Sequence, residues 1–262
     1  MVSVIAAMKK RAAHLLIVCS VLAVIMILPL SSFSFSVEAQ QQYPDFFAGR
    51  EPAGKPLEKL AQEYWQWWIG VPWDNIPINP ETNLNECLIA YDETGLVAFL
   101  VNPYGISYNS ICNIASDKHL IVPLLVGECD PTVPEPATKS GKIEDLWACA
   151  TSADEPFDNW EVVLDNKVLF KQSGNDKVNS DLKKDILVRN SSQFILDIPE
   201  VNSYDAPGGS YPAVVDGYYL TLKPLPPGEH ILKYNILHKQ IVPGQLEKPV
   251  SGSATYLLNV TE

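Results

Sequence analysis

The sequence predicts a mainly β protein, an antiparallel β-sandwich or jelly-roll-like fold with one N-terminal amphipathic helix and a short second helix. Short apolar segments of strand length alternate with turn residues along most of the chain. Of its 262 residues, 21 are proline, 11 tyrosine and 6 tryptophan, which favours strands joined by many turns. With 47% hydrophobic and 19% charged residues, the chain is expected to fold around a core rather than to be disordered.

Helical periodicity is confined to two segments. Apolar residues recur at three- and four-residue steps between Leu57 and Val71, which is the pattern of one helical face. Pro56 suits the first turn of this helix, and Gly70 suits its end. A shorter amphipathic helix is expected over 143–150.

Most of the remaining chain is expected to form strands. Thr94-Gly95 and Asp165-Asn166 lie between apolar segments and predict hairpin turns. Pro123 interrupts an apolar run and predicts an edge position or a bulge, because proline cannot donate to a ladder. Asp216-Gly217 is interpreted as a tight turn or bulge before a strand, and residues 171–185 as a solvated excursion. The expected strand segments are 87–90, 96–101, 119–126, 160–170, 186–188, 194–198, 214–222, 230–237 and 254–260.

The first residues have the pattern of an export signal. Lys9, Lys10 and Arg11 precede a nearly uncharged run over residues 12–30, and Val37-Glu38-Ala39 offers small residues at positions −3 and −1 of a cleavage site. An uncleaved membrane anchor through residues 12–30 is the alternative, since this run is long enough to span a bilayer.

The signal divides the chain into three parts. Residues 1–39 are the predicted signal peptide, residues 40–56 an extended lead-in, and residues 57–262 a single β-rich domain. The whole chain has a net charge of −12, and without its first 39 residues it keeps 16 basic and 30 acidic residues, a net charge of −14. This acidity argues against nucleic acid as a partner, because phosphate contacts need clustered lysine and arginine.

Four cysteines remain after the predicted signal, so two disulfides are expected in an exported chain. Four cysteines allow three pairings, of which Cys87–Cys112 with Cys129–Cys149 is favoured. The first bond would tie neighbouring strands, and the second would close a proline-rich loop between a strand and the short helix. Zinc is not favoured, because no pair of cysteines has the spacing of a zinc finger.

A series of short motifs resembles a family of exported, functionally uncharacterised bacterial and archaeal proteins. The family pattern joins an aromatic helix, four cysteines and a C-terminal segment, in an order that covers most of residues 60–260. The resemblance implies an exported β-rich fold and implies no activity. The matching segments are Tyr64-Trp65-Gln66-Trp67-Trp68, Pro72, Asn79-Pro80, Cys87, Val97-Ala98-Phe99-Leu100, Cys112, Val122-Pro123, Glu128-Cys129, Ala148-Cys149-Ala150, Val215-Asp216-Gly217-Tyr218-Tyr219, Leu225-Pro226-Pro227-Gly228-Glu229-His230 and Thr255-Tyr256.

Four tryptophans in the segment 64–73 are candidate ligand-binding residues. Trp65, Trp67, Trp68 and Trp73 could stack on sugar rings or form a partner surface. The favoured interpretation is that a helix buries these rings in the core. Because Trp67 cannot share one narrow helical face with Trp65 and Trp68, at least one ring is expected to be partly exposed.

Neighbouring carboxylates are the remaining candidates for chemistry. Glu128 and Asp130 flank Cys129, which would hold them rigidly, so they are the best-placed pair for acid–base catalysis. Asp154, Glu155 and Asp158 could bind calcium, although they lack the alternating pattern of a calcium loop. No other cofactor is expected, and an enzyme is not favoured, because the chain has no nucleophile elbow, phosphate loop or H-E-x-x-H motif.

Two N-x-S/T sequences begin at Asn190 and Asn259 and are possible glycan acceptors in an exported chain. The sequence therefore favours an exported, non-catalytic β-sandwich with a binding or structural role in the cell envelope or outside the cell. The alternatives are a carbohydrate-binding or carbohydrate-active protein that uses the tryptophan segment, and a calcium-dependent enzyme that uses an acidic loop. A glycan or an envelope component is the expected partner, and any membrane contact would be through the N-terminal segment only.

Overall fold

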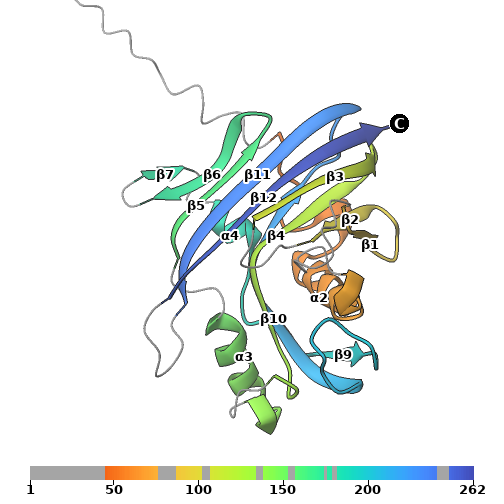
Figure 1. Cartoon of the computed structure of the whole chain (residues 1–262), viewed down its shortest axis with the longest axis vertical. Coiled ribbons are helices and arrows are strands. Elements are labelled where there is room, and N and C mark those ends of the chain that lie inside the picture. The colour runs from red at the N-terminus through yellow and green to blue at the C-terminus, as the bar shows by residue number, and fades with distance from the viewer. Residues whose placement is uncertain are drawn as a thin grey trace, which may run out of the picture. The chain divides into compact units, whose positions relative to one another are not determined.

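The structure is a computed structural model. It describes residues 45–75, 87–101, 107–133, 138–152, 157–173, 176–178, 182–240 and 248–262. The predicted signal peptide and the alternative anchor over residues 12–30 lie outside these ranges. Within the described residues, strands dominate and form two six-stranded sheets (Figure 1). Residues 43–262 make up one compact unit, in agreement with a single β-rich domain.

The first sheet is built around one long strand, β10. Its strands follow the order β1-β2-β4-β10-β8, and β9 pairs with the N-terminal part of β10. The β1–β2 pair is a hairpin that turns at the predicted Thr94-Gly95. The strands are β1 Ile89–Tyr91, β2 Val97–Leu100, β4 His119–Cys129, β8 Leu187–Val188, β9 Phe194–Ile198 and β10 Gly209–Leu222.

The second sheet follows the order β3-β12-β11-β5-β6-β7. Its β5–β6 hairpin turns at the predicted Asp165-Asn166, where both residues have positive φ angles, 49° and 64°. Asparagine and aspartate tolerate this left-handed conformation better than most residues do. The strands are β3 Ser107–Ala115, β5 Phe157–Leu164, β6 Lys167–Ser173, β7 Asp176–Val178, β11 Gly228–Gln240 and β12 Lys248–Thr261.

Both sheets are mixed, which corrects the purely antiparallel prediction. β2 runs parallel to β4, and β3 runs parallel to β12. The period-2 pattern of a strand reports which face is buried but carries no information on the direction of its neighbour, so the parallel pairs could not be read from the sequence. The two parallel pairs also differ from the antiparallel neighbours of a jelly roll. The sandwich part of the prediction is confirmed, and the likeness to a jelly roll is not.

The core lies between the two sheets and is rich in aromatic rings. The Trp160 ring on β5 packs edge-on against Tyr218 on β10, with 4.8 Å between ring centroids, and joins one sheet to the other. On β11 and β12 the alternating residues Leu232, Tyr234 and Tyr256 are at most 2% exposed, as their period-2 pattern predicts.

Three α-helices and three 3-10 helices accompany the sheets in the described residues. α2 begins after Pro56, ends before Gly70 and packs against β10, β9 and β8, while α3 packs against β10 and β4. Among the described residues, none of these helices has both the length and the apolar character needed to cross a membrane. The helices are α2 Leu57–Ile69, α3 Ile143–Ser152, α4 Leu182–Ile186, η1 Pro52–Gly54, η2 Trp73–Asn75 and η3 Thr138–Ser140.

Two segments that were expected to be irregular are packed against the domain. In the lead-in, Phe47 forms a β-bridge with Leu222, and the Arg50 guanidinium donates to backbone carbonyls of residues 184 and 187. In the expected excursion over 171–185, β6 continues to Ser173 and β7 and α4 follow. Leu182 and Ile186 of α4 are buried, so this helix is attached by an i, i+4 apolar pair that the charged lysines around it obscured.

The turn of the β1–β2 hairpin is fixed by Asp92. Its Oδ1 accepts the backbone N–H groups of Leu96 and Val97 at 3.0 and 2.9 Å, and its Oδ2 lies 2.9 Å from Lys55 Nζ. Burial alone would raise the pKa of Asp92, but the hydrogen bonds from Lys55, Thr94 and Val97 outweigh it and lower the pKa to about 2. The ionised side chain thus anchors the hairpin to the segment before α2.

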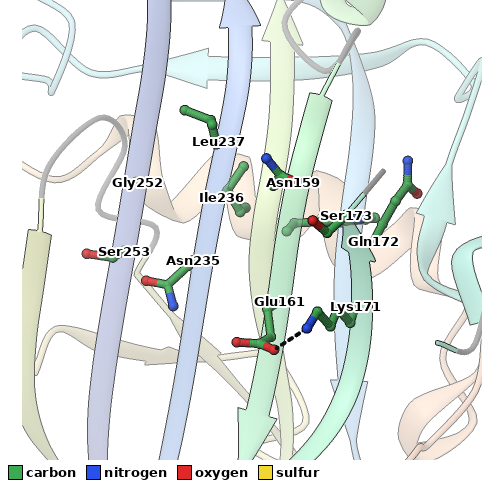
Figure 2. A pocket seen from close by; sticks show the side chains of 11 residues that line it. Asn159, Glu161, Lys171, Gln172, Ser173, Asn235, Ile236, Leu237, Gly252 and Ser253 are labelled. Carbon is green, nitrogen blue, oxygen red and sulfur yellow. Dashed lines mark ion pairs between the residues drawn. The ribbon is translucent and has the colours of Figure 1, made fainter. Parts of the chain in front are cut away.

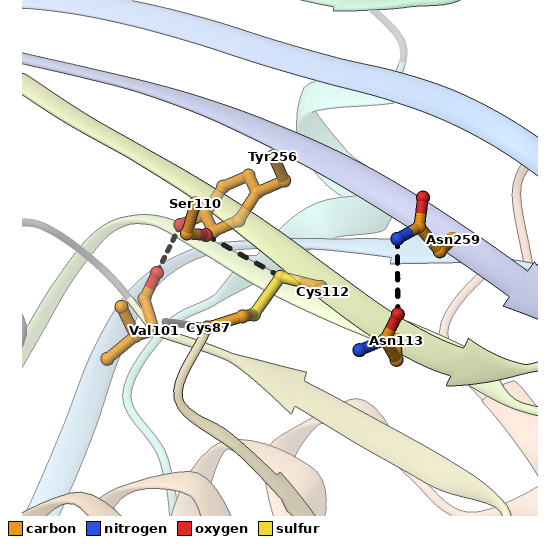
Figure 3. Close-up of a disulfide and its surroundings, with 7 residues drawn as sticks. All are labelled: Cys87, Val101, Ser110, Cys112, Asn113, Tyr256 and Asn259. Carbon is orange, nitrogen blue, oxygen red and sulfur yellow. Dashed lines mark hydrogen bonds between the residues drawn. A yellow bond between two sulfur atoms is a disulfide. The ribbon is translucent and has the colours of Figure 1, made fainter. Parts of the chain in front are cut away.

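The disulfides link layers that the sheets alone do not hold together. Cys87, just before β1 of the first sheet, bonds to Cys112 on β3 of the second sheet, with 4.9 Å between Cα atoms (Figure 3). Cys129 at the end of β4 bonds to Cys149 on α3, with a Cα separation of 6.1 Å. This pairing is the one that the sequence favoured. Bonds of this kind persist in oxidising compartments and are rare in the cytosol.

Pro123 and Gly217 mark the closest contact of β4 with β10. The register shifts between Tyr218 and Tyr219, opposite Leu125 and Pro123, so the predicted bulge is present. Gly217 lies inside β10 at φ +123° rather than before a strand, which corrects the predicted turn. A Cβ on Gly217 would lie 2.4 Å from the Leu125 carbonyl oxygen, so only glycine fits where the two strands meet.

We predict that Gly217→Ala destabilises the domain by about 2–5 kcal/mol, because it combines backbone strain with overpacking. Gly95→Ala is the matched control, since Gly95 also has a positive φ, +71°, but a Cβ added there would have no neighbouring atom within 4 Å. The control is expected to cost only about 1–2 kcal/mol. Chemical denaturation measures both, and equal losses for the two variants would contradict the packing argument.

Candidate functional site

The tryptophans of the aromatic segment are mostly core residues. Trp65 and Trp68 on α2 are each 5% exposed, and Trp67 is half-buried with its ring stacked near Phe99 at 6.4 Å between centroids. Trp67 is therefore the partly exposed ring that the helical geometry predicts. The backbone of Trp73 forms part of η2, and its side chain lies outside the described residues. The three described rings do not form an open stacking surface.

These rings stabilise the contact between α2 and the first sheet. Trp65 Nε1 donates to the hydroxyl of Tyr219 on β10 at 2.9 Å, in a fully buried position. Tyr64 contacts the rings of Tyr219 and Phe99 edge-on, at 6.3 and 6.2 Å. Because buried polar groups are costly without a partner, the Trp65–Tyr219 hydrogen bond fixes the rotation of α2 on β10.

The carboxylate pair Glu128 and Asp130 lies inside the protein. Glu128 is 8% exposed and Asp130 is 1% exposed. Asp130 Oδ1 accepts the backbone N–H of Thr132 at 2.5 Å, while neither carboxylate oxygen of Glu128 has a hydrogen-bond partner among the described residues. Glu128 pairs in register with Val215 on β10, so this carboxyl group projects from the middle of the first sheet.

Burial raises the pKa of Glu128 well above its ordinary value, and the neighbouring Asp130 raises it further. A carboxyl group in such a place stays neutral at a pH where an exposed glutamate is ionised. Asp216, 1% exposed on the adjacent strand, differs because the Arg189 guanidinium lies 3.5 Å from its Oδ1. The predicted acid–base pair is rigid, as expected, but it is too deeply buried to meet a substrate in this structure.

The structure leaves the calcium hypothesis largely untouched. Asp154 and Glu155 lie outside the described residues, and for Asp158 only the backbone, in β5, is described. Among the residues that are described, no group of three histidine, cysteine, aspartate or glutamate side chains could hold a metal ion.

The described surface is hollowed on the outer face of the second sheet. This hollow, which we call the groove, has a volume of about 430 Å³ and crosses β6, β5, β11 and β12 (Figure 2). Trp160 and Ile236 are buried and face the core, so their neighbours along each strand point away from it. The lining residues are Asn159, Trp160, Glu161, Lys171, Gln172, Ser173, Asn235, Ile236, Leu237, Gly252 and Ser253.

Strand register brings the polar side chains of the groove together. Glu161 is the register partner of both Asn235 on β11 and Lys171 on β6, which makes one row across three strands. The Lys171 ammonium lies 3.7 Å from Glu161 Oε1, and both side chains are 37% exposed (Figure 2). The next row places Leu237 beside Asn159, and Asn159 beside Ser173. The groove thus offers donors, acceptors and one apolar side chain, with its two charges balanced.

The groove was not found from the sequence. Its residues come from four strands that are up to 94 positions apart, and each strand contributes only a few ordinary polar side chains. Polar residues at period 2 are typical of any solvated sheet face, so the pattern carries no signal before the register is known.

The two possible glycan acceptors have different surroundings. Asn190 is exposed and lies in a turn between β8 and β9, with φ +50°. Asn259 lies within β12, and its Nδ2 donates to Asn113 Oδ1 on β3 at 3.1 Å (Figure 3).

The fold and the site define a disulfide-bonded, mixed β-sandwich with a polar groove on one face. Comparison of the chain with protein-family models, with curated proteins and with solved structures finds no match in any of the three. The resemblance of the aromatic helix and cysteine pattern to exported proteins therefore rests on the sequence motifs alone.

We predict that Glu128 makes stability fall as the pH rises. A carboxyl group whose pKa is raised by folding contributes stability below its unfolded pKa, about 4.5, and this contribution is lost as the pH rises toward the folded-state pKa. Between these values the loss approaches about 1.4 kcal/mol per pH unit. Glu128→Gln removes this dependence, so its unfolding free energy should exceed that of the wild type increasingly from pH 5 upward (about pH 5, the start of ionisation).

Urea denaturation at a series of pH values measures the difference between the two proteins. Glu144→Gln, at an exposed position of α3, is the control and should follow the wild type. Parallel pH profiles for wild type and Glu128→Gln would show that Glu128 is not a buried neutral acid.

Proposed function

We propose that this chain is an exported, non-catalytic protein with a binding or structural role in the cell envelope or outside the cell. The observation that carries the proposal is the pair of disulfides, Cys87–Cys112 and Cys129–Cys149. All four cysteines that follow the predicted signal are used, and each bond joins different layers of the fold. A cytosolic protein of this size would rarely depend on such bonds, since thiols are kept reduced there.

Two further features support this proposal. The basic patch, apolar run and small residues of residues 1–39 have the order of a secretory signal, which accounts for how the cysteines would reach an oxidising compartment. The best carboxylate pair, Glu128 and Asp130, is buried in the first sheet rather than placed at a surface opening, which favours binding over catalysis. The net negative charge disfavours nucleic acid as the partner.

Cell fractionation with N-terminal analysis of the purified protein tests this proposal. We expect the protein in the envelope or the medium, with Gln40 as its first residue. Recovery from membranes with residues 12–30 still attached would replace cleavage by the anchored alternative. Recovery of the full chain from the cytosol would overturn the proposal.

A second candidate function is carbohydrate binding, with the groove rather than the tryptophan segment as the site. The specific observation is the polar row of Asn235, Glu161 and Lys171, next to the apolar side chain of Leu237. Sugars present many hydroxyl groups and apolar ring faces, and a site with balanced charges, amides and hydroxyls matches an uncharged ligand of this kind. The volume of about 430 Å³ lies within the usual range for small-ligand sites.

We predict that a panel of neutral oligosaccharides includes one that binds in the groove, measured by calorimetry and by Trp160 fluorescence. Asn235→Ala and Glu161→Gln should each weaken its affinity at least about tenfold, which is about 1.4 kcal/mol. Trp67→Phe, in the aromatic segment, is the control and should leave the affinity unchanged. Loss of binding in Trp67→Phe alone would return the site to α2, and no binding by any glycan would remove this candidate.

A further inference from the structure

The two N-x-S/T sequences of this chain can be told apart by their place in the fold. Asparagine-linked glycans need an accessible side-chain amide and a hydroxyl two residues later. The first sequence is Asn190-Ser191-Ser192, and the second is Asn259-Val260-Thr261. Figure 1 shows that the second lies in a strand inside a sheet, whereas the first lies in the connection between β8 and β9.

Asn190 is held at the surface by its buried neighbour. Ser191 is fully buried, since its Oγ accepts the backbone N–H of Val215 and its carbonyl accepts Trp147 Nε1, both at 2.9 Å. Asn190 itself is exposed and has φ +50°, a left-handed turn conformation that asparagine tolerates. A large group on this side chain would therefore extend into solvent without moving the packed segment behind it.

The hydroxyl of Ser192 is available only before the domain is complete. In the folded protein, Ser192 Oγ and its backbone N–H both donate to Glu58 Oε1, at 2.5 and 2.7 Å. Glu58 lies on α2, 134 positions earlier in the chain, so this contact forms as the tertiary structure forms. A transferase that reads the hydroxyl would therefore act on the unfolded or partly folded chain during export.

Asn259 has neighbours on both sides. It is half-buried in β12, its register partners are Asn113 on β3 and Glu229 on β11, and its Nδ2 is the donor to Asn113 Oδ1. A sugar on this nitrogen would crowd the side chains of both adjacent strands and would disturb the parallel β3–β12 pair.

We infer that Asn190 carries an N-linked glycan and that Asn259 does not. This inference rests on the proposed export, because the donor is a lipid-phosphate-linked oligosaccharide outside the cytosol. The Asn190 Nδ2 attacks the anomeric carbon of the sugar, and the new C–N bond forms as the bond from that carbon to the phosphate oxygen breaks. The lipid phosphate leaves with the electron pair, and the amide loses one proton.

Peptide mass mapping of the full chain from its native cells tests the inference. We expect the peptide that contains Asn190 to carry a sugar mass that is lost in Asn190→Gln and Ser192→Ala. Ser192→Thr keeps the acceptor hydroxyl and should restore the glycan, which separates recognition from any effect on the Glu58 contact. Asn259→Gln is the matched control and should leave the sugar mass unchanged.

The other outcomes separate this inference from the proposed function. An exported protein with both disulfides formed and an unmodified Asn190 peptide would overturn the inference and leave the export proposal standing. A sugar on the Asn259 peptide would also overturn it. A cytosolic protein that retains residues 1–39 would overturn both, because no glycan donor would then meet the chain.

Discussion

The arrangement of this domain depends on covalent bonds at places where hydrogen bonding between strands is short. β2 pairs with β4 over only three residues, Val97–Phe99, and β1 is a three-residue strand at the edge of the same sheet. Cys87–Cys112 holds this weak edge to β3 of the opposite sheet. Each disulfide closes a loop of about 20 to 25 residues, which removes about 3 kcal/mol of chain entropy from the unfolded state.

β10 is the second element that joins the layers. Its consecutive residues Tyr218 and Tyr219 point to opposite faces, so one ring packs on Trp160 of the second sheet and the other accepts a hydrogen bond from Trp65 of α2. The same strand contacts β4 so closely at Gly217 that no side chain fits there. Because one strand serves both interfaces, the aromatic segment contributes to the core, and the binding surface lies elsewhere.

Sequence periodicity predicted the elements of this fold better than their assembly. The apolar steps of α2, the Asp165-Asn166 turn and the alternating strands β11 and β12 are local patterns, and the structure contains them. The direction of β2 and β3 and the interior position of Gly217 depend on residues far away in the chain, so local patterns could not indicate them. The same holds for the groove, whose row of Asn235, Glu161 and Lys171 exists only through strand register.

The account depends most directly on the oxidation state of Cys87, Cys112, Cys129 and Cys149 in the native protein. Alkylation of the denatured protein from its own cells, without reductant and followed by mass spectrometry, measures the number of free thiols. The account predicts that none of the four cysteines is alkylated until reductant is added, and that peptides linked as 87 to 112 and 129 to 149 are recovered. Alkylation of all four cysteines without reductant would contradict it.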